Sequence, residues 1–384
     1  MILLLPAALC PADTFTNVRT GEVLHGYKTS KSEGVESFIQ AAEKGPVKIN
    51  LAEWKKKSDR QGRNNNVVVM ELAGPIMYQI EAEALQNALT RISDEGPLFI
   101  LLEIDSPGGR VDLAQNICAA LIKASDNVQV ISYVKGGRNG GAISAAAAVA
   151  LATDKIYMSG DSVIGAATMI TGQAETMKQA YGEDVGEKLD SAWRARLASL
   201  AEHKGRSGML ARAMVDRDLE IIEVNENGKR LFIEAVNKKP GQELVRTWSP
   251  KGSLLTLTAN EAAKCGFTDA IVGSRQELLQ QEGAADANIV INDDIQRAGE
   301  ELRRAQGQLA RIRKSFDFEF KKAEGDMYYA EALRMLREAR VEMKTVLNLA
   351  KKYPDLNLDV KSIEDNLNTI EASYRNLKRD ARRH

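Results

Sequence analysis

The sequence has few cysteines and few aromatic residues, and each shortage excludes a class of protein. Its 3 cysteines in 384 residues are Cys10, Cys118 and Cys265, which lie far apart. This spacing supports neither a disulfide framework nor a zinc site, and we expect Cys118 and Cys265 to be buried thiols. An aromatic share of 5% beside a hydrophobic content of 44% predicts a sizeable, aliphatic core.

An excess of charge of one sign is also absent. Lys+Arg 52 and Asp+Glu 53 give a net charge of -1, so there is no global reason to expect a nucleic acid as partner. After the first residues no run approaches the ~18 apolar residues of a membrane helix, which leaves only a peripheral membrane association open.

The apolar start of the chain, MILLLPAALCPA, resembles the end of a secretory signal peptide. We therefore expect an exported protein in a periplasmic or other extracytoplasmic compartment, with the cytoplasm as the alternative. Shifts in composition and pattern predict six segments along the chain. They are a signal-peptide-like segment (1–13), a small β-meander of three or four strands (14–55), a linker (56–66), a mixed α/β domain (67–275), a second linker (276–292), and three antiparallel helices or a long helical hairpin (293–384).

The most informative stretch covers residues 98–167, where strand patterns alternate with helical ones. Three apolar, β-branched runs at 98–104, 128–134 and 155–158 are separated by two helical segments. This alternation of strand and helix patterns is typical of repeated β-α-β units, so we predict a mostly parallel sheet.

A candidate nucleophile lies after the second strand. Glycines 140 and 141 precede Ala142-Ile143-Ser144, and an alanine-rich helix follows. This order places the Ser144 hydroxyl at the positive end of a helix dipole and leaves the Ala145 N–H free to donate. The alternative is an ordinary serine helix cap, which contributes only ~1 kcal/mol.

A second glycine turn, Ser106-Pro107-Gly108-Gly109, follows the first strand. An N–H group from this turn together with that of Ala145 would form a two-donor oxyanion hole, in which the loss of one donor typically costs ~10²–10³ in rate. The alternative is a glycine turn that holds no ligand.

A serine nucleophile needs a base, and the sequence offers few histidines. Its 3 histidines are His25, His203 and His384, none of which closely follows Ser144 in the α/β segment. A lysine can replace histidine if burial lowers its pKa from ~10.4 towards ~7–8. The candidates are Lys155, Lys178, Lys188 and Lys204. Lys155 lies within a strand pattern and reads as structural, and spacing alone leaves Lys178 and Lys188 both open.

Four segments together resemble the ClpP/crotonase superfamily, and most closely its NfeD-type serine proteases, which are related to signal peptide peptidase A. They are IDSPGG at 104–109, GGAISA at 140–145, SVIGA at 162–166, and LTANEA through Gly266 to Asp269. The resemblance implies a spiral of ββα units, to which the small N-terminal β module and the C-terminal helical segment are added. It also implies a serine–lysine dyad of Ser144 and Lys188, because the family's lysine opens the helix before a Gly-Arg pair, here Gly205-Arg206.

The implied function is a serine endopeptidase that cleaves extended apolar peptide segments through an acyl-enzyme. Gly108, Gly109 and Ala145 would donate to the oxyanion; no cofactor or metal is implied. Peptide or protein substrates and a homo-oligomer are the expected partners. Two features depart from the family: Ala146 stands where the family usually has glycine, and a charged helical segment replaces the membrane helices of its long members. The alternatives are a catalytically inactive scaffold with the same fold and a crotonase-like acyl-CoA enzyme.

Overall fold

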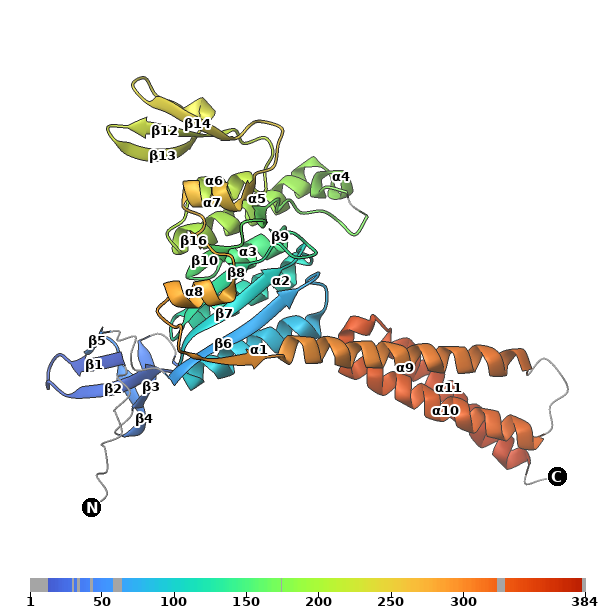
Figure 1. The fold of residues 1–384 in the computed structure, drawn as a ribbon. Helices are drawn as coiled ribbons and strands as arrows, with labels where there is room; N and C mark the ends of the chain where they lie inside the picture. Colours follow the sequence, from blue (N-terminus) through green and yellow to red (C-terminus); the bar gives the residue numbers. More distant parts are fainter. Residues whose placement is uncertain are drawn as a thin grey trace, which may run out of the picture. The chain divides into compact units, whose positions relative to one another are not determined.

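The structure is a computed structural model that describes residues 13–29, 31–32, 35–41, 44–57, 64–173, 175–322 and 329–381 (Figure 1). The signal-peptide-like segment and Cys10 lie outside the described residues. The chain forms two compact units, Met1–Met77 with Ala82–Ile295, and Tyr78–Glu81 with Gln296–His384. Within the described ranges, no helix is both long and apolar enough to cross a membrane.

The centre of the first unit is a parallel sheet of six strands in the order β16-β10-β8-β7-β6-β17. The strands are β6 (Asn64–Ala73), β7 (Pro97–Asp105), β8 (Gln129–Val134), β10 (Lys155–Met158), β16 (Ala270–Ile271) and β17 (Asn288–Asn292). Helices cover both faces, so the central strands are continuous apolar runs; in β7, Phe99 to Leu102 are fully buried. The predicted mixed α/β fold with a mostly parallel sheet is confirmed.

A second, short sheet holds β9 (Gly141–Ile143), β11 (Val163–Gly165) and β15 (Thr256–Thr258). The chain repeatedly runs from a strand of the large sheet to a strand of the short one and then into a helix, as in β8, β9 and α3 (Ala145–Leu151). This ββα repeat confirms the architecture that the resemblance implied. It brings the turn after β7 beside β9, because Ser106 forms a bridge with Ala142, and β9 lies beside β11.

The helices of the first unit include the two that the alternation of strands and helices predicts, α2 (Val111–Ser125) and α3. The others are α1 (Gln79–Glu95), whose first turn belongs to the second unit, α4 (Met177–Tyr181), α5 (Glu183–His203), α6 (Gly208–Ala213), α7 (Ala259–Cys265) and α8 (Arg275–Gln281). Helix α7 begins at a Thr258 cap and ends at Gly266. Cys118 and Cys265 are buried as expected, and burial raises the pKa of each thiol to about 12.

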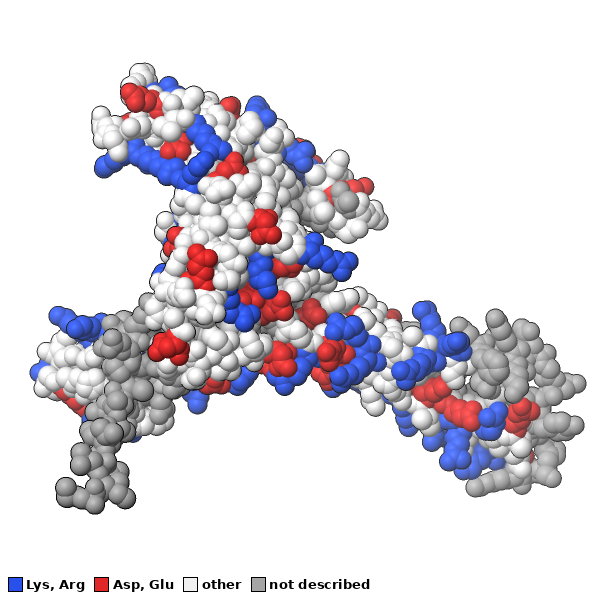
Figure 2. Space-filling view, viewed as in Figure 1, with Lys and Arg blue, Asp and Glu red and all other residues white. Residues whose placement is uncertain are grey.

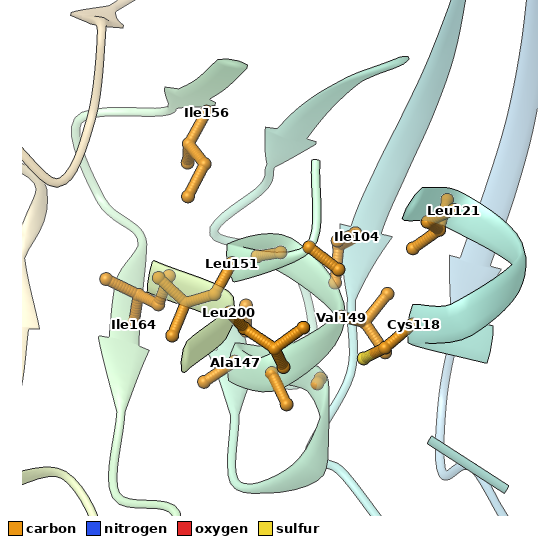
Figure 3. Packing of buried hydrophobic residues seen from close by; sticks show 14 of the residues in the cluster. Ile104, Cys118, Leu121, Ala147, Val149, Leu151, Ile156, Ile164 and Leu200 are labelled. Carbon is orange, nitrogen blue, oxygen red and sulfur yellow. The ribbon is translucent and has the colours of Figure 1, made fainter. Parts of the chain in front are cut away.

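The alanine-rich helix α3 is enclosed by the core. All seven of its residues are buried, and Figure 3 shows Ala147, Val149 and Leu151 among side chains of α2, α5 and the neighbouring strands. Small side chains allow the close approach of these elements, because interiors are packed to the density of organic crystals. The first residue of this enclosed helix follows Ser144 directly, so the core fixes the position of the candidate nucleophile.

One sheet has no counterpart in the sequence-based prediction. The strands β12 (Ile221–Glu226), β13 (Lys229–Glu234) and β14 (Glu243–Ser249) form an antiparallel sheet in the order β13-β12-β14. Its hairpin turn is Asn227-Gly228, both with positive φ, which is a strong hairpin signal that could have been found. In Figure 2 the two signs of charge are interspersed over most of the visible face, and blue side chains gather over this sheet.

The N-terminal module has more strands than predicted. It is a five-stranded antiparallel sheet of β1 (Asp13–Asn17), β2 (Val23–Lys28), β3 (Glu36–Ala41), β4 (Gly45–Asn50) and β5 (Trp54–Lys57). The linker prediction for 56–66 is wrong at both ends, because β5 pairs with β1 and β6 begins at residue 64. Residues 58–63 lie outside the described part.

The linker prediction for 276–292 is also wrong. Helix α8 starts at Ser274, whose side chain accepts a hydrogen bond from the Glu277 N–H, and its buried Leu278 and Leu279 pack under the sheet. Strand β17 then pairs in parallel with β6. The apolar run of β17, Ile289 to Ile291, is too short to separate from a loop by pattern alone.

The second unit is helical, as predicted. Its long helices are α9 (Asp294–Lys322), α10 (Tyr329–Lys352) and α11 (Val360–Asp380), with a 3-10 turn at Pro354–Leu356. Apolar residues from all three helices pack together, among them Leu309, Val346 and Ile363. In the 3-10 turn, Asp355 accepts hydrogen bonds from the N–H groups of Gln79 and Ile80 (2.7 and 2.9 Å).

Candidate active site

Ser144 stands between β9 and α3 in a backbone conformation that is rare for a residue with a side chain. Its φ is 58° and its ψ is -128°, a region that costs about 1–3 kcal/mol and persists only where the surroundings impose it. Its N–H donates to the Gly165 carbonyl oxygen at 2.9 Å. Its hydroxyl makes no hydrogen bond to any other residue that the structure describes.

These features rule out the ordinary helix-cap interpretation of Ser144. A capping serine has an extended backbone and accepts a hydrogen bond from the N–H group two or three residues later. Ser207, at the start of α6, does both and accepts from Leu210 N–H. Ser144 does neither, so its hydroxyl is not used to stabilise the helix. A strained strand-to-helix turn that exposes a serine hydroxyl is the arrangement found at serine nucleophiles.

The second glycine turn lies directly against Ser144. A Cβ atom built on Gly108, whose φ is +87°, would stand 2.6 Å from the Ser144 Cβ and 2.7 Å from the Ala145 nitrogen. On Gly109, with φ +155°, it would stand 2.2 Å from the Ile76 carbonyl oxygen. Only glycine fits at either position. The turn is held from its other side, because the Ile76 N–H donates to the Gly108 carbonyl oxygen at 2.8 Å.

The three N–H groups predicted to form an oxyanion hole are not equivalent. That of Gly108 already donates to the Ser106 hydroxyl at 3.1 Å. Those of Gly109 and Ala145 donate to no acceptor within the described part of the chain. Of the three predicted donors, Gly109 and Ala145 therefore keep an N–H group without an acceptor, whereas the Gly108 N–H is committed to Ser106.

The four candidate lysines differ in their partners. Three are held in ion pairs: Lys155 with Glu282 (2.7 Å), Lys204 with Asp154 (2.6 Å), and Lys178 with Glu183 (2.8 Å) and Glu187 (3.0 Å). The hydrogen bonds to these glutamates raise the pKa of Lys178, which makes it a poor proton acceptor. Lys188 forms no ion pair with any described residue, so of the four its amine is the one not committed to a carboxylate.

The expectation that Lys188 is buried is wrong for this structure. Lys188 is exposed in the second turn of α5, and the buried side of that helix carries Gly186, Trp193 and Leu197. About 100° of rotation per residue puts Lys188 on the side opposite Gly186. Sequence spacing could not reveal this, because it locates a helix without fixing which side faces the core.

The side of α5 that carries Lys188 includes two exposed apolar side chains. Val185 and Leu189, on adjacent turns, are 47% and 41% exposed, and Tyr181, just before the helix, is 59% exposed. Positions three and four residues apart lie on one side of a helix, so Val185 is a neighbour of both Lys188 and Leu189.

A hydrogen bond joins helix α5 to the segment that follows β11, which also holds the Ser144 backbone. The indole N–H of Trp193 donates to the Ala167 carbonyl oxygen at 2.7 Å, two residues after Gly165, which holds the Ser144 N–H. One turn earlier, one carboxylate oxygen of Asp190 is buried without a hydrogen bond among the described residues. Burial, and then the charge of Glu187, raise the pKa of Asp190. Neither residue was singled out from the sequence, because a lone tryptophan or aspartate in a helix carries no signal.

No group of His, Cys, Asp and Glu side chains suited to a metal ion occurs in the ranges that the structure describes. Ala146, the departure from the family pattern, is fully buried in α3.

Comparison with known proteins relates the domain around this site to one family. Residues 75–242 match the family model described as NfeD1b, N-terminal domain. The chain is 30% identical over 218 residues to the membrane protein NfeD1b of Bacillus subtilis (strain 168), covering 56% of this chain and 41% of that protein. It is 26% identical over 228 residues to the membrane-bound protease PH1510 of Pyrococcus horikoshii, covering 59% and 42%. The chain thus spans about two-fifths of the length of these curated relatives.

Solved structures are also similar. A mutant of the 1510-N membrane-bound stomatin-specific protease superposes with a TM-score of 0.43 at 21% identity, covering 60% of this chain and 98% of that one. A ClpP1 mutant from Listeria monocytogenes superposes with a TM-score of 0.30 at 16% identity, covering 55% and 94%.

Proposed function

We propose that the first unit is a serine endopeptidase with Ser144 as nucleophile and Lys188 as general base, on the premise that residues 75–242 match the NfeD1b, N-terminal domain model. The observation that carries the proposal is the backbone of Ser144, which is strained, is held by Gly165, and leaves the hydroxyl without a hydrogen bond. The name of the Pyrococcus horikoshii relative, a membrane-bound protease, supports the same class of reaction.

In the proposed reaction the neutral amine of Lys188 takes the proton of the Ser144 hydroxyl, and the oxygen attacks the scissile carbonyl carbon. The N–H groups of Gly109 and Ala145 bind the resulting oxyanion. When the C–N bond breaks, the Lys188 ammonium returns its proton to the leaving amine and an acyl ester remains on Ser144. A water molecule then gives a proton to Lys188 and attacks the ester, and the Lys188 ammonium gives that proton to the departing serine oxygen. This step releases the acid and restores both the serine hydroxyl and the neutral amine.

Because Lys188 is exposed, we propose that the bound substrate shields it from water. A general base acts best in a site from which water is excluded. A peptide with apolar side chains that lies against Tyr181, Val185 and Leu189 would cover Lys188 and remove water from it. Such coverage couples apolar substrates to activation of the base, in line with the expected cleavage of extended apolar segments.

The expected setting of the enzyme is also part of the proposal. Both curated relatives are named as membrane proteins, which supports work at a membrane; the extracytoplasmic side is proposed from the signal-peptide-like start of the sequence alone. A homo-oligomer fits the ClpP-like architecture of the first unit.

A fluorophosphonate probe tests the dyad, since it reacts with activated serines. Wild-type protein should be labelled on Ser144, as located by peptide mapping, and Ser144→Ala should abolish labelling. Lys188→Ala should reduce the labelling rate by at least ~100-fold, from the typical contribution of a general base. The matched controls are Ser207→Ala, which removes a true cap, and Lys178→Ala, which removes an ion-paired lysine; both should be labelled normally. Equal labelling of wild type and Lys188→Ala would refute the role of Lys188.

The second candidate function, an inactive scaffold, is favoured by one observation, the exposure of Lys188 on the side of α5 away from the core. Wild-type protein that resists the probe at every pH between 6 and 10 would select the scaffold over the peptidase.

A further inference from the structure

Ser106 is a fully buried serine whose side chain has a defined partner within the site. Its hydroxyl oxygen accepts the N–H of Gly108 at 3.1 Å. A serine side chain that binds the backbone two residues later is a local turn that stabilises the following residues. Here it shapes the turn that leads into Gly109.

The backbone of the same residue joins this turn to the strand before the nucleophile. The Ser106 N–H donates to the Gly141 carbonyl oxygen at 2.8 Å, and the Ser106 carbonyl oxygen accepts from Ile143 N–H at 3.0 Å. Ile143 precedes Ser144 directly. One buried residue is therefore bonded both to the strand that presents the nucleophile and to the turn that presents Gly109.

We propose that Ser106 is a positioning residue, whose hydroxyl holds the Gly108 N–H away from the substrate and so fixes the Gly109 N–H as the donor opposite Ala145. The inference rests on the proposed function and adds to it the residue that sets the distance between the two oxyanion donors. A hydrogen-bond donor stabilises the transition state only if it stands ready at the place where charge develops. Loss of the Ser106 hydroxyl should therefore reduce the rate of the reaction more than the binding of the reagent.

Three variants separate this role from general destabilisation. Ser106→Ala leaves the buried Gly108 N–H without its acceptor. Ser106→Thr retains a hydroxyl at the same place. Ser132→Ala is the matched control, because Ser132 is equally buried and its hydroxyl is hydrogen-bonded to Thr153, a residue outside the proposed site. Thermal unfolding of each variant confirms that it is folded before it is assayed.

The assay is the concentration dependence of fluorophosphonate labelling, which gives a maximal rate and a half-saturating concentration. Ser106→Ala should lower the maximal rate by about 10–100-fold, less than the complete loss of a donor, and leave the half-saturating concentration within about threefold. Ser106→Thr should recover most of the rate, and Ser132→Ala should label as wild type. Backbone hydrogen exchange in residues 106–110 should be faster in Ser106→Ala alone.

The outcomes distinguish the two proposals. If wild type is labelled and Ser106→Ala is labelled at the same rate, the positioning role is overturned and the peptidase proposal is left intact. The same holds if hydrogen exchange in residues 106–110 of Ser106→Ala is the same as in wild type. An equal loss of rate in Ser132→Ala also overturns it, since any buried serine would then act alike. Unlabelled wild type overturns the peptidase, and the positioning role with it.

Discussion

Replacement of Gly108 by alanine tests whether the glycine turn and the nucleophile are packed as one unit. The added methyl group would meet the Ile143 carbonyl oxygen and the Ser144 Cβ at 2.6 Å, well inside contact distance. These atoms belong to the backbone and to the first side-chain carbon, so no flexible group can move aside. The turn, the Ser144 backbone, or both must shift.

The size of the effect follows from two contributions. A residue other than glycine at φ +87° costs about 1–2 kcal/mol, and overpacking against fixed atoms costs about 1–3 kcal/mol. Gly108→Ala should therefore lower the free energy of unfolding by about 2–5 kcal/mol. Gly140→Ala is the matched control, because Gly140 has φ +81° but nothing within 4 Å of its Cβ position. It should lose only the conformational contribution of about 1–2 kcal/mol.

The two variants should differ more in reactivity than in stability. Displacement of the Ala145 N–H from its place beside the turn should reduce the fluorophosphonate labelling rate of Gly108→Ala by ~10²–10³, and Gly140→Ala should stay within about tenfold of wild type. Urea unfolding and labelling kinetics on the same preparations provide both quantities. A folded Gly108→Ala variant that is labelled as fast as Gly140→Ala would refute the proposed packing of the oxyanion turn on Ser144.

Three further substitutions test other parts of the account. Asp190→Asn should stabilise the fold by ~0.5–1 kcal/mol at pH 7, because it removes a partly screened carboxylate with an unsatisfied oxygen. The raised pKa of Asp190 means that this gain is present above the folded-state pKa and disappears as pH falls through it, which thermal unfolding from pH 7 to pH 3 measures. Burial alone would raise the pKa of Glu103, but hydrogen bonds from Arg275 and Lys135 outweigh it and hold the pKa below its usual range. The stability that Glu103 contributes is therefore present above its unfolded-state pKa and is lost as pH falls through its folded-state pKa. Glu103→Gln should lower the free energy of unfolding by ~1.5–3 kcal/mol at pH 7 and should weaken the pH dependence of urea unfolding between pH 5 and pH 2. An unchanged pH dependence would contradict the pairing of Glu103 with Arg275 and Lys135. Ala147→Leu should destabilise by at least ~1–3 kcal/mol, because α3 has no room for a larger side chain; wild-type stability by calorimetry would contradict the packing around this helix.

Much of the first unit was predictable because its local signals agree with its tertiary structure. The apolar run at 98–104 became β7, and the alanine run after Ser144 became α3. The Thr258 cap and Gly266 bound α7 as their residue types require. The sheet of β12, β13 and β14 was not predicted, although Asn227-Gly228 is a hairpin signal in the sequence. Strand β17 was not predicted because its strand conformation depends on pairing with β6.

The candidate site was predictable in its chemistry but not in its geometry. The order of glycines around Ser144 predicted a turn between strand and helix, yet its strained φ and ψ depend on the hydrogen bond from Ser144 to Gly165. The choice between Lys178 and Lys188 could not be made from spacing, since it depends on the ion pairs that Lys178 forms. The exposure of Lys188 depends on how α5 is rotated about its axis, which is set by Trp193 and its contact with Ala167.

The most direct test of the account is the distance between the Ser144 oxygen and Lys188 Nζ in a crystal structure of the protein with a covalently bound peptide phosphonate. If Lys188 is the base, that distance should be ~2.6–3.2 Å, with the phosphonyl oxygen within hydrogen-bond reach of the N–H groups of Gly109 and Ala145. A Ser144 adduct in which Lys188 still faces solvent would contradict the dyad.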